Sequence, residues 1–331
     1  MTLHLHGVGH FHPENEITNR FLEDLDIGTN DAWILERVGI RSRRTVLPLD
    51  YIRETRNRDL RAAADVALYD TAELGRRAAL RALERAGIGP ERIGLVLSGG
   101  CAGDFTCPAE AAEIAGRLGI RAPSIDVASA CTSFLAQLRV LSMMRPEALP
   151  PFVLLVAQEA LTRTVDYADR ATAVLFGDGA SAAVVSTREP GRARVLHAAL
   201  ESDPAAADRV QIRRFGYFRQ DGRAVQMFAI RKTLAEWHRL VAARGDDERP
   251  LHLVGHQANL RVLETTCERG GIDPSRHHSN VELFGNTGAA SALSVISQEW
   301  EKWGPQDDVA LVGVGAGLTW GSCLLRFEGT A

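Results

Sequence analysis

Two segments, one in each half of the chain, place the strongest constraint on its fold. Residues 176–186 (FGDGASAAVVS) and residues 313–327 (GVGAGLTWGSCLLRF) each run from a glycine-rich turn into a strand-like series of small and β-branched residues. The pair predicts an internally duplicated fold, with chance similarity between two glycine turns as the alternative. The linker-like sequence TREPGR at 187–192 places the boundary near residue 187 and divides the chain into 1–187 and 188–331.

Around these segments, short β-rich runs alternate with longer helical patterns, which is typical of an α/β fold. Residues 72–87 place Leu74, Ala78 and Leu83 on one helical face, and Gly87 closes that helix. Further helices are predicted at 109–118, from about residue 131, at 225–243, after Asn259 and at 288–302, and strands at 93–98, 124–127, 152–157, 251–254 and 309–314.

Length, composition and charge limit the classes of function. A chain of 331 residues is long enough for two domains, and 45% hydrophobic with 24% charged residues suits a globular core. The net charge of −4 gives no basic excess, so we expect no nucleic-acid partner. The first residues lack a signal-peptide pattern, and no apolar run approaches the roughly 18 residues of a membrane span. We therefore expect a cytoplasmic protein without membrane association.

The cysteines and histidines give little reason to expect a metal. The five cysteines are odd in number and scattered, unlike a disulfide framework or paired metal ligands. Cys267 and Cys323 lie in helix and strand patterns and are interpreted as packing residues. The spacing of four N-terminal histidines resembles a metal site, but strand alternation and a nearby turn argue against their convergence: His4, His6, His10 and His12. We expect no metal and no resident cofactor.

Cys131 lies where a predicted strand meets a predicted helix. The strand ends near Val127, the small residues ASA follow, and the helix begins at or just after Cys131. This arrangement places the sulfur at a helix N-terminus, where the partial positive charge favours the thiolate that attacks thioester carbonyls. A lone cysteine can equally be a small buried packing residue. The pattern makes Cys131 a candidate nucleophile.

Two polar residues of the second half are candidates for the same site. His256 follows the predicted strand 251–254, and strand ends are where α/β enzymes place catalytic groups. Asn286 lies in FGNTGAAS (284–291), a glycine-flanked turn that leads into a helix of small residues. Together the two side chains can donate hydrogen bonds to a carbonyl oxygen that gains negative charge. Separately, each also fits a structural role, as a strand-end histidine or a helix-capping asparagine.

Six ordered motifs span nearly the whole chain: WILERVGIRSRR (33–44), DVASACTSF (126–134), DRATAVLFGDGASAAV (169–184), HQANLR (256–261), GNTGAAS (285–291) and GAGLTWGSCLLRF (315–327). Together they resemble the beta-ketoacyl-acyl carrier protein synthase III family of condensing enzymes. The resemblance implies a duplicated thiolase-like α/β fold with five layers, α-β-α-β-α, and a homodimer.

The resemblance also implies roles for the catalytic candidates. Cys131 matches the acylated nucleophile, and His256 with Asn286 matches the pair that polarises the carbonyl of the second thioester. The backbone amides of Cys131 and Ala316 match the donors that stabilise the first tetrahedral intermediate. The family usually has glycine at position 316, but the backbone N–H is the working group there.

Further positions match residues that bind substrates or partners. Coenzyme A contacts are implied for Trp33, Arg37, Arg170 and Asn259, and docking of an acidic acyl carrier protein for Arg261. Arg41, Arg43 and Arg44 are candidates for the same basic patch. Cys107 matches a position that reaches across the dimer into the neighbouring acyl channel, where a small residue indicates a longer or unusual acyl chain.

The resemblance implies a Claisen condensation between an acyl thioester (acyl-CoA or acyl-carrier protein) and a malonyl or beta-ketoacyl thioester, through an acyl-cysteine. Residues 45–66 and 201–226 depart from the housekeeping enzymes, which favours specialised lipid or polyketide biosynthesis over initiation of fatty acid synthesis from acetyl-CoA. The order Cys–His–Asn also occurs in papain-like proteases, but this chain lacks the sequence signature of those enzymes. The alternative from another class of function is a non-catalytic subunit of a heteromeric synthase pair. The length of the acyl chain and the biosynthetic pathway stay open.

Overall fold

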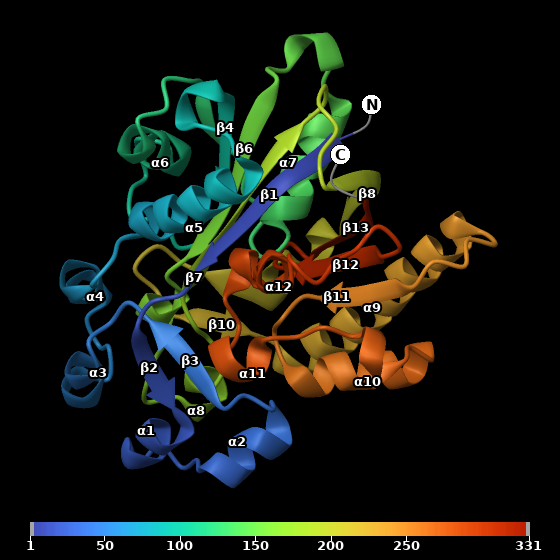
Figure 1. The fold of residues 1–331 in the computed structure, drawn as a ribbon. Helices are drawn as coiled ribbons and strands as arrows, with labels where there is room; N and C mark the ends of the chain where they lie inside the picture. Colours follow the sequence, from blue (N-terminus) through green and yellow to red (C-terminus); the bar gives the residue numbers. More distant parts are fainter. Residues whose placement is uncertain (1–2, 329–331) are drawn as a thin grey trace.

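The computed structural model describes residues 3–328, which form a sheet of nine strands flanked by helices (Figure 1). The strand order is β11-β12-β13-β8-β1-β7-β6-β4-β5, with two small two-stranded sheets, β2–β3 and β9–β10, outside it. The strands are β1 (Leu3–Phe11), β2 (Asn15–Thr18), β3 (Ser42–Thr45), β4 (Ile93–Gly99), β5 (Ser124–Asp126), β6 (Phe152–Glu159), β7 (Gly179–Ser186), β8 (Ala193–Ser202), β9 (Val210–Ile212), β10 (Phe218–Gln220), β11 (Leu251–Gly255), β12 (Asp308–Gly315) and β13 (Thr319–Phe327).

The helices connect these strands and cover the sheet. They are α1 (Asn19–Asp24), α2 (Asp31–Arg37), α3 (Leu49–Thr55), α4 (Leu60–Val66), α5 (Thr71–Ala86), α6 (Glu110–Leu118), α7 (Ser133–Met143), α8 (Arg170–Ala173), α9 (Gly222–Arg244), α10 (Leu260–Gly270), α11 (Val281–Phe284) and α12 (Ser291–Gln298). Most agree with the predicted ranges, including the end of α5, where Gly87 adopts the left-handed conformation. The divergent residues 45–66 form α3 and α4.

The sheet repeats one topology in the two halves of the chain. The order β1-β7-β6-β4-β5 is matched by β8-β13-β12-β11, with antiparallel and parallel neighbours in the same sequence. An isolated parallel bridge between Leu253 and His277 stands where the fifth strand of the second half would lie. The halves join where β1 pairs with β8. Residue 187 lies between β7 and β8, and the division there stays a prediction.

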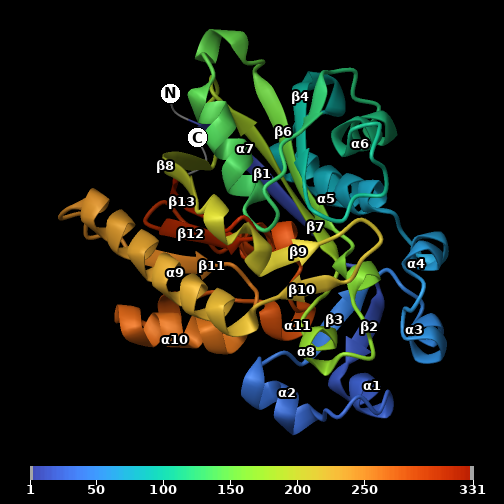
Figure 2. The ribbon, with the colours of Figure 1, turned by 180° about the vertical axis from the view of Figure 1, so that it is seen from behind.

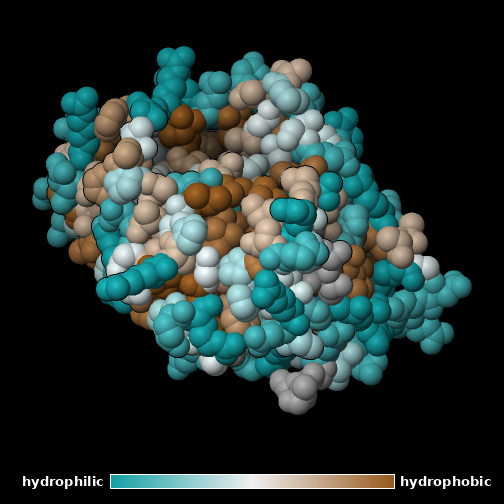
Figure 3. Space-filling model, turned by 90° about the horizontal axis from the view of Figure 1, so that it is seen from above, coloured by the Kyte–Doolittle hydropathy of each residue, from teal (hydrophilic) through white to brown (hydrophobic). Residues whose placement is uncertain are grey.

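Three buried clusters explain the layers. α7 and α12 share one apolar core with strands from both halves of the sheet. Leu138 of α7, Ile296 of α12 and Leu311 of β12 belong to it. α5 and α6 pack on the outer face of the first half, and α9 and α10 on that of the second. The layers are therefore α5/α6, sheet, α7/α12, sheet, α9/α10, and the predicted five-layered thiolase-like fold is confirmed. Seen from above, the surface gathers hydrophobic residues around a hollow (Figure 3).

One predicted helix is wrong in its extent. Residues 288–302 form a short 3-10 turn, Gly288–Ala290, followed by α12, which ends at Gln298. The chain turns there so that the indole rings of Trp300 and Trp303 enter the central core, with 1% and 4% of their surface exposed. Burial of two large side chains therefore outweighs continuation of the helix.

Candidate active site

The turn that carries Cys131 is fixed by its own hydroxyl groups. Ser133 Oγ donates to the carbonyl of Ala130 at 2.7 Å and accepts from the N–H of Ser129 at 3.0 Å. Ala130 has φ 44°, in the left-handed region that residues with a Cβ rarely adopt. The turn presents Cys131 two residues before α7, as the predicted strand–turn–helix arrangement requires.

The end of β12 lies directly against this turn. A Cβ on Gly315 would stand 3.1 Å from both the Cβ and the backbone N of Cys131, and one on Gly313 would stand 2.8 Å from a methyl of Leu135. Only glycine allows so close an approach of two backbones. Ala316, the next residue, is thereby held beside the nucleophile candidate, and it lines the same cavity.

His256 and Asn286 reach this cavity from the second half of the chain. His256 is the first residue after β11, and its Nδ1 lies 2.9 Å from Ser291 Oγ at the start of α12. The Oδ1 of Asn286 accepts from the N–H of Gly288 at 2.9 Å, which leaves its Nδ2 available to a ligand. A Cβ on Gly288 would collide with Glu159 at 2.9 Å, and its φ is 53°.

The structure brings the predicted residues into one cavity of about 180 Å³. Cys131, His256, Asn286 and Ala316 all line it, and the other walls are largely apolar: Leu161, Phe176, Ile212, Phe218 and Val225. An apolar cavity with a few convergent polar groups is typical of a ligand site. The roles assigned to the four polar positions remain proposals.

The ionisation of Cys131 differs from the sequence-based expectation. Burial raises the pKa of the Cys131 thiol to about 12, and the negative charge of Glu159 adds to the rise. The resting sulfur is therefore a thiol, because desolvation outweighs the helix N-terminus. Burial also lowers the pKa of His256 to about 4, so its imidazole is neutral at neutral pH.

Glu159 is a residue of this site that the sequence analysis missed. It is fully buried at the end of β6, and its carboxylate accepts from the N–H of Cys101 at 3.1 Å, from its Sγ at 3.3 Å and from the N–H of Ala289 at 3.3 Å. Burial raises the pKa of Glu159 to about 7. A signal was present, because Glu159 interrupts the apolar run 152–161 at a strand end. The carboxylate links the loop at Cys101 to the turn that carries Asn286.

Replacing Glu159 by glutamine should make Cys131 more reactive. The substitution removes the negative charge that helps to raise the pKa of Cys131, while the amide oxygen can still accept from the N–H of Cys101 and Ala289. More thiolate is then present at a given alkaline pH, so alkylation by iodoacetamide should be several times faster. Peptide mass spectrometry separates Cys131 from Cys101 as the alkylated residue. An unchanged rate at Cys131 would show that the carboxylate does not act on the thiol.

The predicted coenzyme A contacts cluster beside α2. The guanidinium groups of Arg170 and Arg37 lie 5.2 Å and 5.6 Å from the ring centre of Trp33, within cation–π range. Asn259 Oδ1 caps α10 by accepting from the N–H of Arg261 at 2.8 Å, and its Nδ2 approaches the carbonyl of Arg37 at 3.4 Å. All four predicted contacts are therefore neighbours, and Ala258, before Asn259, lines the catalytic cavity.

The predicted basic patch needs correction at Arg43. This side chain is fully buried and donates to the carbonyl of Val174 at 3.0 Å and to Asn19 Oδ1 at 2.6 Å, so it cannot meet a carrier protein. The guanidinium of Arg261 already has partners within the chain, because it donates to the carbonyl of Leu35 at 2.7 Å and pairs with Glu264 at 2.7 Å. Arg41 is exposed and Arg44 partly so.

The remaining candidates do not join the cavity. Cys107 is exposed in the loop before α6, outside the lining of the cavity, and its reach across a dimer stays a prediction. Cys267 and Cys323 are buried packing residues. His10 Nδ1 bonds to Ser297 and His12 Nδ1 to the carbonyl of Asp178. In the described part of the chain, no cluster of three or more His, Cys, Asp or Glu residues could hold a metal ion.

No helix within residues 3–328 has both the length and the apolar composition that crossing a membrane would require.

Comparison with known proteins gives consistent matches over the full length. The family model described as 3-oxoacyl-[acyl-carrier-protein (ACP)] synthase III matches residues 125–204, and the model of its C-terminal part matches residues 247–327. A beta-ketoacyl-[acyl-carrier-protein] synthase III from Oceanobacillus iheyensis is 34% identical over 334 residues, which cover 99% of each chain.

Solved structures of similar proteins extend these matches to three dimensions. The 3-oxoacyl-[acyl-carrier-protein] synthase III from Aquifex aeolicus superposes with a TM-score of 0.86 at 27% identity, covering 98% of this chain and 100% of the other. The priming beta-ketosynthase from the R1128 polyketide biosynthetic pathway gives 0.82 at 28% identity, covering 99% and 97%.

Proposed function

The chain belongs to the 3-oxoacyl-[acyl-carrier-protein] synthase III family of condensing acyltransferases, and on that premise we propose that Cys131 carries the acyl group of a Claisen condensation. The observation that supports this assignment is the convergence of Cys131, His256 and Asn286, from two halves of the chain, on one apolar cavity. The acyl donor is an acyl-CoA or acyl-carrier thioester. The extender is a malonyl or beta-ketoacyl thioester carried by an acyl carrier protein.

In the first step, Cys131 takes the acyl group from the donor. Its sulfur attacks the thioester carbonyl, the bond from that carbon to the donor sulfur breaks, and the thiol proton passes to the departing sulfur. Because the resting group is a thiol, its proton is lost as the sulfur attacks and is taken up by the departing sulfur of the donor. The negative charge on the carbonyl oxygen is met by the backbone N–H groups of Cys131 and Ala316.

In the second step, a malonyl thioester loses carbon dioxide and becomes the nucleophile. The electrons of the broken carbon–carbon bond form an enolate, whose oxygen accepts hydrogen bonds from His256 Nε2–H and Asn286 Nδ2–H. The enolate carbon attacks the acyl-cysteine, the bond to Cys131 sulfur breaks, and the sulfur takes up a proton. The apolar walls keep water from hydrolysing the acyl-enzyme.

Ser291 selects the tautomer of His256 that this step needs. The Ser291 oxygen lies 2.9 Å from His256 Nδ1 and 3.4 Å from the backbone N–H of Gln257. Because the Gln257 N–H can only donate, the Ser291 hydroxyl proton is directed to Nδ1. Nδ1 is then an acceptor, and the proton of the neutral ring resides on Nε2, facing the substrate. Ser291 is a positioning residue that acts through His256.

Replacing Ser291 by alanine should slow condensation about tenfold, the cost of one lost hydrogen bond that orients a neutral imidazole. Acyl loading of Cys131 should change little, because that step does not require Nε2 as a donor. Nitrogen NMR of the imidazole should show a shift from the Nε2–H tautomer towards a mixture. The control is Ser294→Ala, one turn along α12. The Ser294 hydroxyl donates to the backbone carbonyl of Ser291 and accepts from Asn280 Nδ2, and neither bond involves His256. Equal effects of the two substitutions on condensation would remove the proposed role.

The proposed substrates are those of specialised lipid or polyketide biosynthesis rather than acetyl-CoA. Support comes from the divergent residues 45–66, which form α3 and α4, and 201–226, which include the β9–β10 hairpin that lines the cavity. Intact-protein mass spectrometry after incubation with a panel of acyl thioesters identifies the preferred acyl group. Exclusive loading with acetyl-CoA would instead assign the chain to initiation of fatty acid synthesis. Failure of every thioester to load would remove Cys131 as the acyl carrier.

We also propose a homodimer that pairs through β5. This strand is one of the two edges of the nine-stranded sheet, and Ile125 on it is 45% exposed. An unpaired edge with an exposed apolar side chain is suited to pairing with a second copy. Light scattering after size exclusion should give twice the mass of the chain. Ile125→Lys should shift the protein to a single chain, and a single-chain mass for the unaltered protein would contradict the proposal.

A further inference from the structure

A second cavity of about 400 Å³ adjoins the catalytic one. Cys101 and Ile212 line both cavities, so the two spaces meet at these residues. In Figure 2, β9 and β10 lie between α9, which lines the catalytic cavity, and α4, which lines the second, and Figure 1 shows β10 in the same place. We call the second space the distal chamber; Leu60, Ala64, Phe105, Arg163, Arg213 and Phe215 are among its walls.

The catalytic cavity alone is small for an acyl enzyme. A cavity of about 150 Å³ accommodates a benzene molecule, so the 180 Å³ beside Cys131 holds about six carbon atoms. The thioester end of the extender must enter the same space. A longer acyl chain on Cys131 therefore has to continue past Cys101 and Ile212 into the distal chamber.

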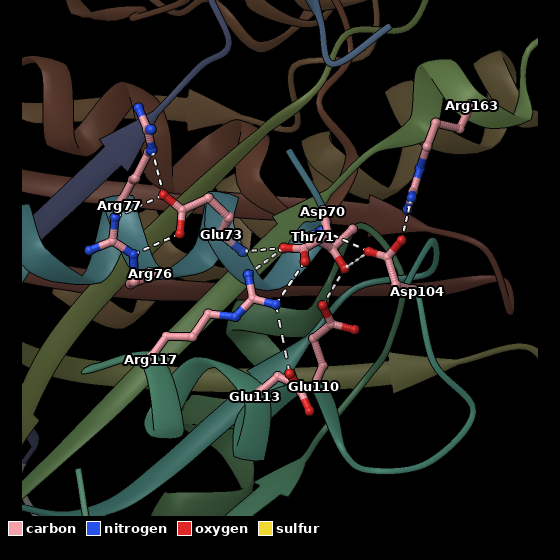
Figure 4. Close-up of polar contacts among 10 residues, drawn as sticks. All are labelled: Asp70, Thr71, Glu73, Arg76, Arg77, Asp104, Glu110, Glu113, Arg117 and Arg163. Atoms are coloured by element: carbon pink, nitrogen blue, oxygen red, sulfur yellow. Dashed lines mark hydrogen bonds and ion pairs between the residues drawn. The ribbon is translucent and has the colours of Figure 1, made fainter. Parts of the chain in front are cut away.

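The wall of the distal chamber is built into the buried structure. Arg163, with 7% of its surface exposed, forms an ion pair with Asp104 and donates to the carbonyl of Ala102 at 2.8 Å. Asp104 also accepts from the backbone N–H of Thr71 at 2.7 Å and from its hydroxyl at 2.6 Å (Figure 4). The N–H of Cys101 is held by Glu159. The loop 101–104 is thus fixed at both ends, and the chamber is pre-formed.

The lining of the chamber carries more positive than negative side chains. The carboxylate of Asp104 is fully engaged by Arg163 and Thr71. Arg213 and Arg214 are exposed, and neither forms an ion pair within residues 3–328. Phe215 follows them with φ 54° and 71% of its surface exposed, and the Arg61 guanidinium lies 4.8 Å from its ring centre, within cation–π range. The walls combine apolar residues, among them Leu60, Phe105 and Phe215, with polar ones, and the guanidinium groups of Arg213 and Arg214 stand among them. This mixture fits a hydrocarbon chain with an anionic end.

Resting on the proposed acylation of Cys131, we propose that the distal chamber binds the far end of an acyl chain that ends in a carboxylate. The substrates would be half-thioesters of dicarboxylic acids, with the hydrocarbon between Phe105 and Phe215 and the carboxylate at Arg213 and Arg214. Loading is the same exchange as for any thioester: the bond from the acyl carbon to coenzyme A sulfur breaks, the bond to Cys131 sulfur forms, and the thiol proton goes to coenzyme A.

The experiment compares coenzyme A thioesters of matched length: hexanoyl with adipyl, octanoyl with suberyl, and decanoyl with sebacyl. Loading rates on the full-length enzyme are measured by intact-protein mass spectrometry, and the rate of each carboxylated thioester is divided by that of its plain partner on the same sample. The carboxylated member should load about fivefold faster at one or more of these lengths, as expected for exposed ion pairs. That preference should shrink as sodium chloride is added.

Two sets of variants locate the preference. In the double variant Arg213→Gln with Arg214→Gln the ratio should fall to about one, whereas Arg219→Gln, on exposed β10 outside both cavities, should leave it unchanged. Ala64→Trp, which narrows only the distal chamber, should slow decanoyl and sebacyl loading relative to hexanoyl. Equal loading of each pair at every length, or a preference that survives the double arginine variant, would overturn the proposal. Failure of the unaltered enzyme to load any of these thioesters would instead overturn the proposed function.

Discussion

Replacement of Cys131 by alanine should abolish both acyl loading and carbon–carbon bond formation, with a loss of at least about 10⁴-fold in rate. The thiol is the atom to which the acyl group is transferred, and no neighbouring side chain of the catalytic cavity reproduces its position between the end of β12 and the start of α7. The measurement is twofold: intact-protein mass for the acyl adduct, and a product assay with an acyl thioester and malonyl-carrier protein.

The control for this prediction is Cys267→Ala. Cys267 is a free thiol buried in α10 among the residues of the outer core, away from the catalytic cavity, so its loss should leave loading intact. The other thiol that lines the cavity is Cys101, whose Sγ is bound to Glu159. Persistent adduct formation in the Cys131 variant would therefore identify Cys101 as the acceptor and contradict the assignment of Cys131.

Local sequence signals predicted the framework of the site well. The small-residue turn before α7, the strand end before His256 and the glycine-flanked turn at Asn286 are each specified by residues close in sequence. The glycines carry much of this information, because Gly315 and Gly288 stand where a Cβ would collide with Cys131 and Glu159. Repetition of the strand pattern likewise predicted the duplicated sheet.

Ionisation and burial were not predictable in the same way. The pKa of Cys131 depends on how completely the other half of the chain covers it, and on the charge of Glu159, 28 positions away along the sequence. Arg43 looked like surface charge because it stands beside Arg41 and Arg44, yet its guanidinium bonds to Val174 and Asn19 in the interior. These properties arise from long-range packing, which a pattern of neighbouring residues does not record.

Replacement of His256 or of Asn286 by alanine should leave acyl loading of Cys131 largely intact and slow condensation by about 10²–10³-fold. Each substitution removes one donor to the enolate oxygen in the second step, whereas the first step uses the N–H groups of Cys131 and Ala316. Rates of adduct formation and of product formation, measured on the same preparation, separate the two steps. His238→Ala, on the exposed face of α9, is the matched histidine control.

The double variant provides a stricter test of the shared oxygen. If His256 and Asn286 act on one enolate oxygen, each depends on the other to place the substrate, and the double variant should lose less than the product of the two single losses. Independent roles would give losses that multiply. Acyl loading that falls as steeply as condensation in either single variant would place that side chain in the first step, and the division of labour between the two pairs of donors would then be wrong.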